Sequence, residues 1–259
     1  MSSRRVIVLL HGHNAGPFAL LPLAWYLRWF CVRKPGSLAK PGFLAQQSPL
    51  AQQRPLAQQG PLAQQGPLAE RGVAVLVPKY DTNGITSLAV LMERVGVAVE
   101  DELRKSGFDR DATTLVVVGQ SLGGIAAMNL HAYGWTVAHA VAVGSPLRGA
   151  RFVDVVRRHA PLVSRLLRDP TFDFLLTYKL QTPPPHSFHT ISCGLFSSSF
   201  DGCVYRDEAT LDRRFHTHEP NLHHVTGWAT LQLWRSVWAA LEARDPAHGA
   251  RASSAACAT

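Results

Sequence analysis

Cysteines, charged residues and long apolar runs are all scarce in this sequence of 259 residues. The four cysteines are Cys31, Cys193, Cys203 and Cys257. They form no Cys-x-x-Cys pair, and no histidine spacing completes a zinc pattern. We therefore expect free thiols, no metal site and no cofactor, with a Cys193–Cys203 bridge as the alternative for that pair.

Membrane and leader segments are not indicated either. The sequence contains no stretch of about 18 uninterrupted apolar residues, so it predicts no membrane span. The apolar run at residues 6–10 is shorter than the usual signal-peptide core of about 7–15 residues, and no small-residue cleavage site follows it. We expect a cytoplasmic protein in which this run is a buried strand.

Charged residues make up only 17% of the chain, and the formal net charge of +8 comes mostly from scattered arginines. No zinc-finger, basic-zipper or RNA-recognition pattern accompanies them, so we expect no nucleic-acid partner. The basic residues then form a solvated surface. Peripheral contact with a membrane or lipid surface is the alternative partner.

Strand-like apolar runs alternate with helical patterns along the chain, which predicts an α/β fold with a mostly parallel sheet flanked by helices. Hydrophobic residues make up 46%, enough for one continuous core, so residues 1–244 are expected to form a single domain. The expected strands lie at residues 4–10, 73–77, 115–118, 137–143 and 190–196, and the expected helices at 17–32, 87–106 and 123–133.

Three segments depart from this alternation. Residues 43–66 repeat a six-residue unit of the type Pro-Leu-Ala-Gln-Gln-Gly, which predicts a flexible, low-complexity insertion because proline interrupts helices and glutamine gives little to bury. A docking segment is the alternative. Residues 150–187 lack a clear strand and carry a basic amphipathic pattern at 152–167, which fits a small helical cap or a pair of packed surface helices. Residues 245–259 are expected to form a flexible tail.

The most informative motif is Gly119-Gln-Ser121-Leu-Gly123, which matches G-x-S-x-G. In this motif a strand turns sharply into a helix and leaves the serine in a strained backbone conformation at the apex. Gly119 and Gly123 form the nucleophile elbow, because larger side chains would meet neighbouring backbone. An apolar strand precedes the motif and a helical pattern follows it, so we predict that Ser121 is a nucleophile.

Such a nucleophile needs backbone N–H groups that converge on the developing oxyanion. The loop at residues 11–16 follows the first strand and contains Gly12, so the N–H of His13 is one predicted donor. The N–H of Leu122, directly after the nucleophile, is the other. Alternatively, His11 and His13 are ordinary loop histidines or a pair of metal ligands. The sequence offers no further ligand cluster to complete such a metal site.

With these motifs placed, the chain resembles the α/β-hydrolase family, especially its lipase and esterase branch. The resemblance covers residues 4–149 and extends more loosely to residue 241. It implies hydrolysis of carboxylic esters or related acyl compounds without a cofactor, and we expect the substrate to be a small hydrophobic acyl ester. The motifs that carry it are His11-Gly12 after a strand, the strand with its proline at 75–80, Gly119-Gln-Ser-Leu-Gly-Gly124 and Gly144-Ser-Pro-Leu-Arg-Gly149.

In this fold the catalytic acid and then the histidine follow the serine along the chain. Asp201 lies in an Asp-Gly turn after the last expected strand and is the predicted acid, although such a turn also forms without any catalytic role. Its rivals are Asp173, Asp207 and Glu208. The predicted base is His224, which lies before the helical pattern that closes the chain.

The surroundings of His224 depart from the family pattern. Lipase-like relatives usually carry the base in a Gly-x-His or Gly-x-x-His turn, and here Trp228 or Thr230 occupies that place after Gly227. Either His224 or its neighbour His223 is displaced from the usual position, or the triad is incomplete. Two further candidates for the base, His216 and His218, lie earlier in the chain.

Three functions remain open from these residues. The first is a lipase- or esterase-like serine hydrolase that uses Ser121, Asp201 and His224. The second is an acyltransferase or thioesterase on the same scaffold, because acceptor choice depends on the pocket and not on the motif. The third is a catalytically inactive α/β-hydrolase-like binding protein, which the irregular segment around Gly227 favours and the intact serine motif opposes.

Overall fold

A computed structural model describes residues 4–33, 73–160, 167–181, 184–185 and 187–242. The repeat insertion at 43–66 and the tail at 245–259 lie outside these residues. The described part contains a six-stranded sheet of order β2-β1-β3-β4-β5-β6 in which every neighbouring pair is parallel. The predicted α/β class is thereby confirmed. The strands are β1 (Arg4–Leu10), β2 (Val73–Leu76), β3 (Thr113–Gln120), β4 (Val137–Val143), β5 (Phe188–Gly194) and β6 (His216–Pro220).

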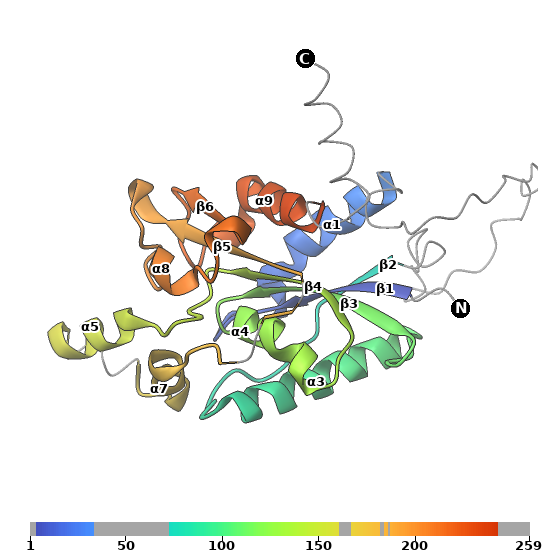
Figure 1. Cartoon of the computed structure of the whole chain (residues 1–259), viewed down its shortest axis with the longest axis horizontal. Coiled ribbons are helices and arrows are strands. Elements are labelled where there is room, and N and C mark those ends of the chain that lie inside the picture. Colours follow the sequence, from blue (N-terminus) through green and yellow to red (C-terminus); the bar gives the residue numbers. More distant parts are fainter. Residues whose placement is uncertain (1–3, 34–72, 161–166, 182–183, 186, 243–259) are drawn as a thin grey trace, which may run out of the picture.

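Helices cover both faces of the sheet (Figure 1). The helices α1 (Leu21–Arg33) and α9 (Leu231–Glu242) pack on one face, and α3 (Leu88–Lys105) and α4 (Leu122–Asn129) pack on the other. Because side chains alternate along a strand, β1 contributes to both cores. Val6, Val8 and Leu10 face α3 and α4, whereas Ile7 and Leu9 face α1 and α9. The uninterrupted apolar run of β1 follows from this double coverage.

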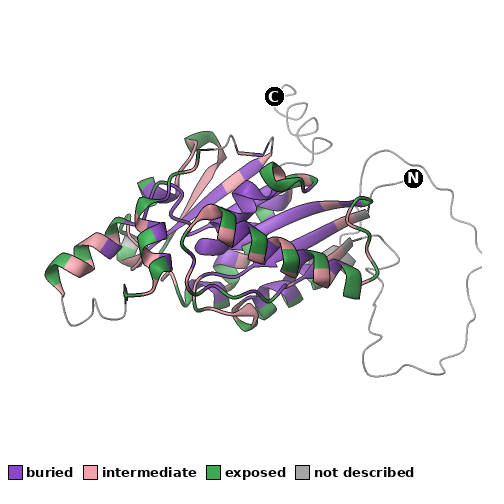
Figure 2. Cartoon of the chain, turned by 90° about the horizontal axis from the view of Figure 1, so that it is seen from below, coloured by how far each residue is buried: buried purple, intermediate pink, exposed green. Residues whose placement is uncertain are grey.

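Helix α3 shows how the local sequence sets an element. Ser87 caps its first turn by accepting a hydrogen bond from the backbone N–H of Val90 at 3.3 Å. Leu91, Val95 and Val99 recur at helical spacing and are buried against the sheet, while the outer face is exposed (Figure 2). Its bounds differ by one residue at each end from the predicted helix.

The prediction missed one strand and shifted another. The polar sequence of β6 has no apolar alternation, and its residues are only partly buried because the strand lies at the edge of the sheet. The fifth strand was predicted at 190–196. It instead ends at Gly194, and the chain continues as the 3₁₀ helix η4 (Leu195–Ser197).

The remaining helices include α5 (Arg151–His159) and α7 (Pro170–Thr177), which lie beyond the carboxyl ends of the strands (Figure 1). The amphipathic helix predicted at 152–167 therefore ends at His159, and residues 161–166 are not described. No helix in the described ranges is long and apolar enough to cross a bilayer. The shorter elements are η1 (Pro17–Leu20), η2 (Leu130–Tyr133), α8 (Arg206–Ala209), η5 (Arg213–Phe215) and η6 (Gly227–Ala229).

Candidate active site

Ser121 lies at the sharp turn between β3 and α4. Its backbone has φ 49° and ψ −116°, a conformation that a residue with a side chain adopts only when its surroundings enforce it. One enforcing contact is the hydrogen bond from the Ser121 N–H to the carbonyl of Val143, at 2.9 Å. The first turn of α4 also directs backbone N–H groups without intrahelical acceptors towards this end of the helix.

The glycines around Ser121 lie too close to neighbouring backbone to carry a side chain. A Cβ atom at Gly119 would lie 2.1 Å from the carbonyl oxygen of Gly123, and one at Gly123 would lie 2.3 Å from the carbonyl oxygen of Leu10. At Gly124 a side chain takes the space instead, because its Cβ would approach the hydroxyl of Ser145. The end of β1 therefore packs directly against the start of α4.

The loop after β1 lies directly against the serine. A Cβ atom at Gly12 would be 3.1 Å from the Cβ of Ser121. The N–H of Ala15 donates to the carbonyl of Gly12 at 3.3 Å, and Asn14 between them has φ 56°, so the loop is a tight turn. His13, the predicted oxyanion donor, is in this turn beside the serine.

Thr82 holds this loop from a distant part of the chain. Its carbonyl accepts the Nδ1–H of His13 at 2.8 Å, which fixes the histidine tautomer, and its hydroxyl accepts the N–H of Asn14 at 3.1 Å. The same carbonyl accepts the hydroxyl of Thr171 at 3.2 Å at the start of α7. The sequence does not predict this role of Thr82, because no motif around Thr82 indicates a contact with a loop nearly 70 residues earlier in the chain.

Asp201 and His224 form a buried pair. The Nδ1 of His224 donates to the Oδ2 of Asp201 at 2.8 Å, and the two side chains are 10% and 1% exposed. The other oxygen, Oδ1, accepts the N–H groups of Cys203 and Val204 at 2.9 and 2.7 Å. A carboxylate held on both oxygens fixes the ring orientation of the histidine and keeps its proton on Nδ1.

This pair lies next to the serine elbow. A Cβ atom at Gly144 would lie 3.2 Å from the Nδ1 of His224 and 3.3 Å from the Oδ2 of Asp201. Gly144 follows Val143, whose carbonyl binds the Ser121 N–H. The side chain of Gln120 also donates to the carbonyl of His224 at 3.2 Å. Residues 120–121, 201 and 224 therefore meet at the carboxyl ends of β3 and β4.

Solved structures share this arrangement of the chain. The lin2722 gene product of Listeria innocua matches with a TM-score of 0.53 at 18% identity, over 92% of this chain and 94% of that one. Phospholipase PlaB of Legionella pneumophila, solved with thio-NAD, matches with a TM-score of 0.51 at 12% identity, over 80% of this chain but only 44% of PlaB. This chain has the α/β-hydrolase fold. No protein-family model and no curated protein matches its sequence.

Within this α/β-hydrolase fold, the rival acids have other partners. Arg151 pairs with Asp207 at 2.6 Å and with the buried Glu208 at 2.8 Å, and the backbone N–H of Arg151 also donates to Glu208. These contacts fix the start of α5. Asp173 is exposed and pairs with Arg157 at 2.5 Å. These three carboxylates therefore bind arginines of α5, whereas Asp201 binds a histidine.

The rival histidines are likewise engaged elsewhere. The Nδ1 of His223 accepts the N–H of Val225 at 3.1 Å. His216 and His218 lie on β6, and both bind the hydroxyl of Ser192 on β5, at 3.0 and 2.8 Å. Burial lowers the pKa of His216 to about 4, which keeps its ring neutral at pH 7.

The departure around Gly227 has a packing explanation. Trp228, at the place where lipase-like α/β-hydrolases usually carry the base, is buried in the core shared by α1 and α9. Its carbonyl accepts the indole N–H of Trp234 at 2.6 Å. His224 lies three residues before Gly227, and its backbone N–H donates to the carbonyl of Asp201 at 2.9 Å. The structure therefore pairs the displaced histidine with the predicted acid.

Neither described cysteine has the lowered pKa of a reactive thiol. Cys193 and Cys203 are free thiols, and burial together with the charge of Asp201 raises the pKa of each to about 12. Both are protonated at neutral pH. Among the residues that the structure describes, no three His, Cys, Asp or Glu side chains gather as a metal site would require.

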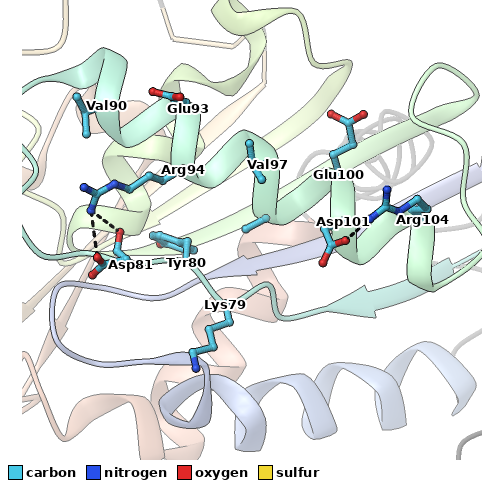
Figure 3. A pocket seen from close by; sticks show the side chains of 11 residues that line it. Lys79, Tyr80, Asp81, Val90, Glu93, Arg94, Val97, Glu100, Asp101 and Arg104 are labelled. Atoms are coloured by element: carbon cyan, nitrogen blue, oxygen red, sulfur yellow. Dashed lines mark hydrogen bonds and ion pairs between the residues drawn. The ribbon is translucent and has the colours of Figure 1, made fainter.

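A separate cavity of about 770 Å³ lies between α3 and the segment after β2 (Figure 3). Two arginines that line it pair with lining aspartates, Arg94 with Asp81 and Arg104 with Asp101. The cavity contains none of the site residues described above. The lining residues are Lys79, Tyr80, Asp81, Val90, Glu93, Arg94, Val97, Ala98, Glu100, Asp101 and Arg104.

Proposed function

We propose that this protein is a serine hydrolase that cleaves carboxylic esters through an acyl-enzyme on Ser121. The observation that carries the proposal is the buried Asp201–His224 pair beside a serine held at positive φ. A strained serine, a histidine with a defined tautomer and an orienting carboxylate are the three groups that nucleophilic catalysis by serine requires.

The reaction would begin with attack of the Ser121 hydroxyl oxygen on the ester carbonyl. The Nε2 of His224 takes the hydroxyl proton, and Asp201 stabilises the imidazolium through the Nδ1–H. The N–H groups of His13 and Leu122 then stabilise the oxyanion of the tetrahedral intermediate. When this intermediate collapses, the alcohol leaves with the proton from His224 and the acyl group stays on Ser121.

Water completes the cycle. His224 removes a proton from a water molecule, the resulting hydroxide attacks the acyl-enzyme, and the carboxylic acid is released as Ser121 regains its proton. No oxidant, metal or cofactor is consumed. Removing one member of such a triad costs several orders of magnitude in kcat and leaves only the acceleration that the oxyanion donors and substrate binding provide.

We infer that the substrates are hydrophobic, lipid-like esters. Phe196 and Val225 lie in the segments after β5 and after His224 and are 92% and 65% exposed, which suits an apolar acyl chain near the site. One protein of similar fold is named a phospholipase, which is consistent with this substrate class.

The test is hydrolysis of p-nitrophenyl esters of increasing acyl length, with mass spectrometry of the intact protein during turnover. We expect an acyl adduct on Ser121, faster turnover of longer chains and no turnover by Ser121→Ala. The matched pair His224→Gln and His223→Gln should differ, with loss of activity only in the first. Activity that survives Ser121→Ala would refute the proposal.

Addition of an alcohol acceptor separates the alternatives. Release of free acid as the main product supports a hydrolase. A transferred ester as the main product would instead identify an acyltransferase on the same scaffold.

A further inference from the structure

The motif Gly-x-Ser-x-Gly leaves the residue before the nucleophile open, and in this chain that residue is Gln120. Gln120 is the last residue of β3 and is only 4% exposed. Its amide nitrogen Nε2 donates to the carbonyl of His224 at 3.2 Å. The residue directly before the nucleophile therefore binds the main chain of the proposed base, which lies 104 positions further along the chain.

This hydrogen bond determines which way the amide of Gln120 points. Its oxygen, Oε1, is buried and has no hydrogen-bond partner among the described residues. A 180° rotation of the amide would place Oε1 against the carbonyl oxygen of His224, where two acceptors repel each other. A buried acceptor without a partner costs free energy. An apolar side chain of the same length would avoid that cost, but it would leave the carbonyl of His224 without its donor.

The segment that carries His224 has little regular structure of its own. It lies between β6 and η6, and the residue after the histidine, Val225, is 65% exposed. Three hydrogen bonds join His224 to the rest of the described structure. Two go to Asp201, from the backbone N–H at 2.9 Å and from Nδ1 at 2.8 Å, and the third comes from Gln120. The two bonds to Asp201 would survive if the acid and the base moved together away from the serine, whereas the bond from Gln120 would not.

We propose that Gln120 is a positioning residue that keeps the ring of His224 within reach of Ser121. The inference rests on the proposed serine hydrolase function and adds the residue that couples the base to the nucleophile. Because Gln120 and Ser121 are adjacent, the amide ties the carbonyl of His224 to the turn that holds the serine. The amide also packs beside the loop after β1, since a Cβ atom at Gly12 would lie 3.7 Å from the Cδ of Gln120. Proton transfer requires heavy atoms about 2.6–3.2 Å apart, so a displacement of the base by about 1 Å would slow it strongly.

The test is Gln120→Met in the full chain, which keeps the length of the side chain and removes the donor. Gln232→Met is the matched control, because the exposed Gln232 on α9 also donates to a backbone carbonyl, that of Pro220 at 3.3 Å. With a soluble p-nitrophenyl ester, we expect kcat to fall about tenfold to hundredfold in Gln120→Met while KM stays nearly constant, because the amide acts on the base and not on the substrate. Neither value should change in Gln232→Met.

A second background separates positioning of the base from a general disturbance of the turn at Ser121. If Gln120 acts through His224, then Gln120→Met should not lower the residual rate of the His224→Gln protein any further, because the base is already absent. A further loss in that background would mean that the turn or the oxyanion donors have moved, and it would overturn the inference. Circular dichroism and Tm verify folding. Gln120→Asn, whose amide ends one methylene short of the carbonyl, is the second variant and should show the same loss of kcat.

The remaining outcomes distinguish this inference from the proposed function. Wild-type kcat in both folded Gln120 variants, in a chain whose activity depends on Ser121 and His224, would overturn the inference and leave the serine hydrolase proposal intact. A rise in KM with unchanged kcat would also overturn it, because the amide would then act on substrate binding. A wild-type chain without activity would overturn both proposals together.

Discussion

Replacement of Asp201 by asparagine should abolish nearly all activity while leaving the fold intact. The Oδ1 of Asp201 accepts two backbone N–H groups, from Cys203 and Val204, so the amide oxygen of an asparagine would keep that place. Its NH₂ group would then face the Nδ1 of His224, in place of the carboxylate Oδ2 that accepts the hydrogen bond from the Nδ1–H in the wild type. Nδ1 must become an acceptor, which moves the ring proton to Nε2. A histidine protonated on Nε2 has no lone pair for the proton of Ser121.

The expected loss is about 10⁴-fold in kcat, equivalent to roughly 5.4 kcal/mol of transition-state stabilisation. KM should change little, because the acid does not contact substrate. Both backbone hydrogen bonds survive, so we expect the Tm to stay within a few degrees of wild type. Kinetics with a soluble p-nitrophenyl ester measure the loss. Asp207→Asn is the control, since that exposed carboxylate pairs with Arg151. A loss of less than tenfold in Asp201→Asn would refute the assigned role of the pair.

Three further predictions concern the turn at Ser121, the loop after β1 and the edge strand β6. Gly123→Ala should lower the free energy of unfolding in urea by about 3 kcal/mol or more, because its Cβ would lie 2.3 Å from the carbonyl oxygen of Leu10; wild-type stability would contradict the crowding. Thr82→Val leaves the N–H of Asn14 without its acceptor, so kcat should fall about tenfold to hundredfold with KM nearly constant, and Thr82→Ser should restore it. His216 has a pKa lowered by burial from 6.5 to about 4, so the unfolded chain binds the proton more readily in this window. Stability in urea should therefore fall by about 1–3 kcal/mol as the pH drops from 6.5 to 4, and a pH dependence unchanged in His216→Gln would exclude this residue as the cause.

The sequence predicts those strands of the sheet that are buried on both faces, because burial requires apolar residues along their length. The predicted bounds of β1 and β4 agree with the structure because most of each strand is an apolar run that helices cover on both faces. The polar edge strand β6 gave no such signal. Its His216 and His218 were considered as bases, whereas they lie on a strand and bind Ser192.

The site was predictable where the chemistry depends on neighbouring residues and not where it depends on distant ones. The elbow around Ser121 is encoded by five consecutive residues with a strand before and a helix after them. Local sequence does not distinguish His223 from His224, because the two residues are adjacent and have nearly the same spacing from every motif. The choice depends on the hydrogen bond between the His224 N–H and the Asp201 carbonyl, which turns one ring towards the acid. The support of His13 by Thr82 has the same long-range origin.

The central claim is that His224 activates Ser121, and labelling with a fluorophosphonate probe tests it without knowledge of the substrate. We predict rapid labelling at Ser121 alone, slowed about hundredfold or more in His224→Gln and unchanged in His223→Gln. Absence of labelling in the folded wild-type protein, or equal labelling rates in both histidine variants, would contradict it.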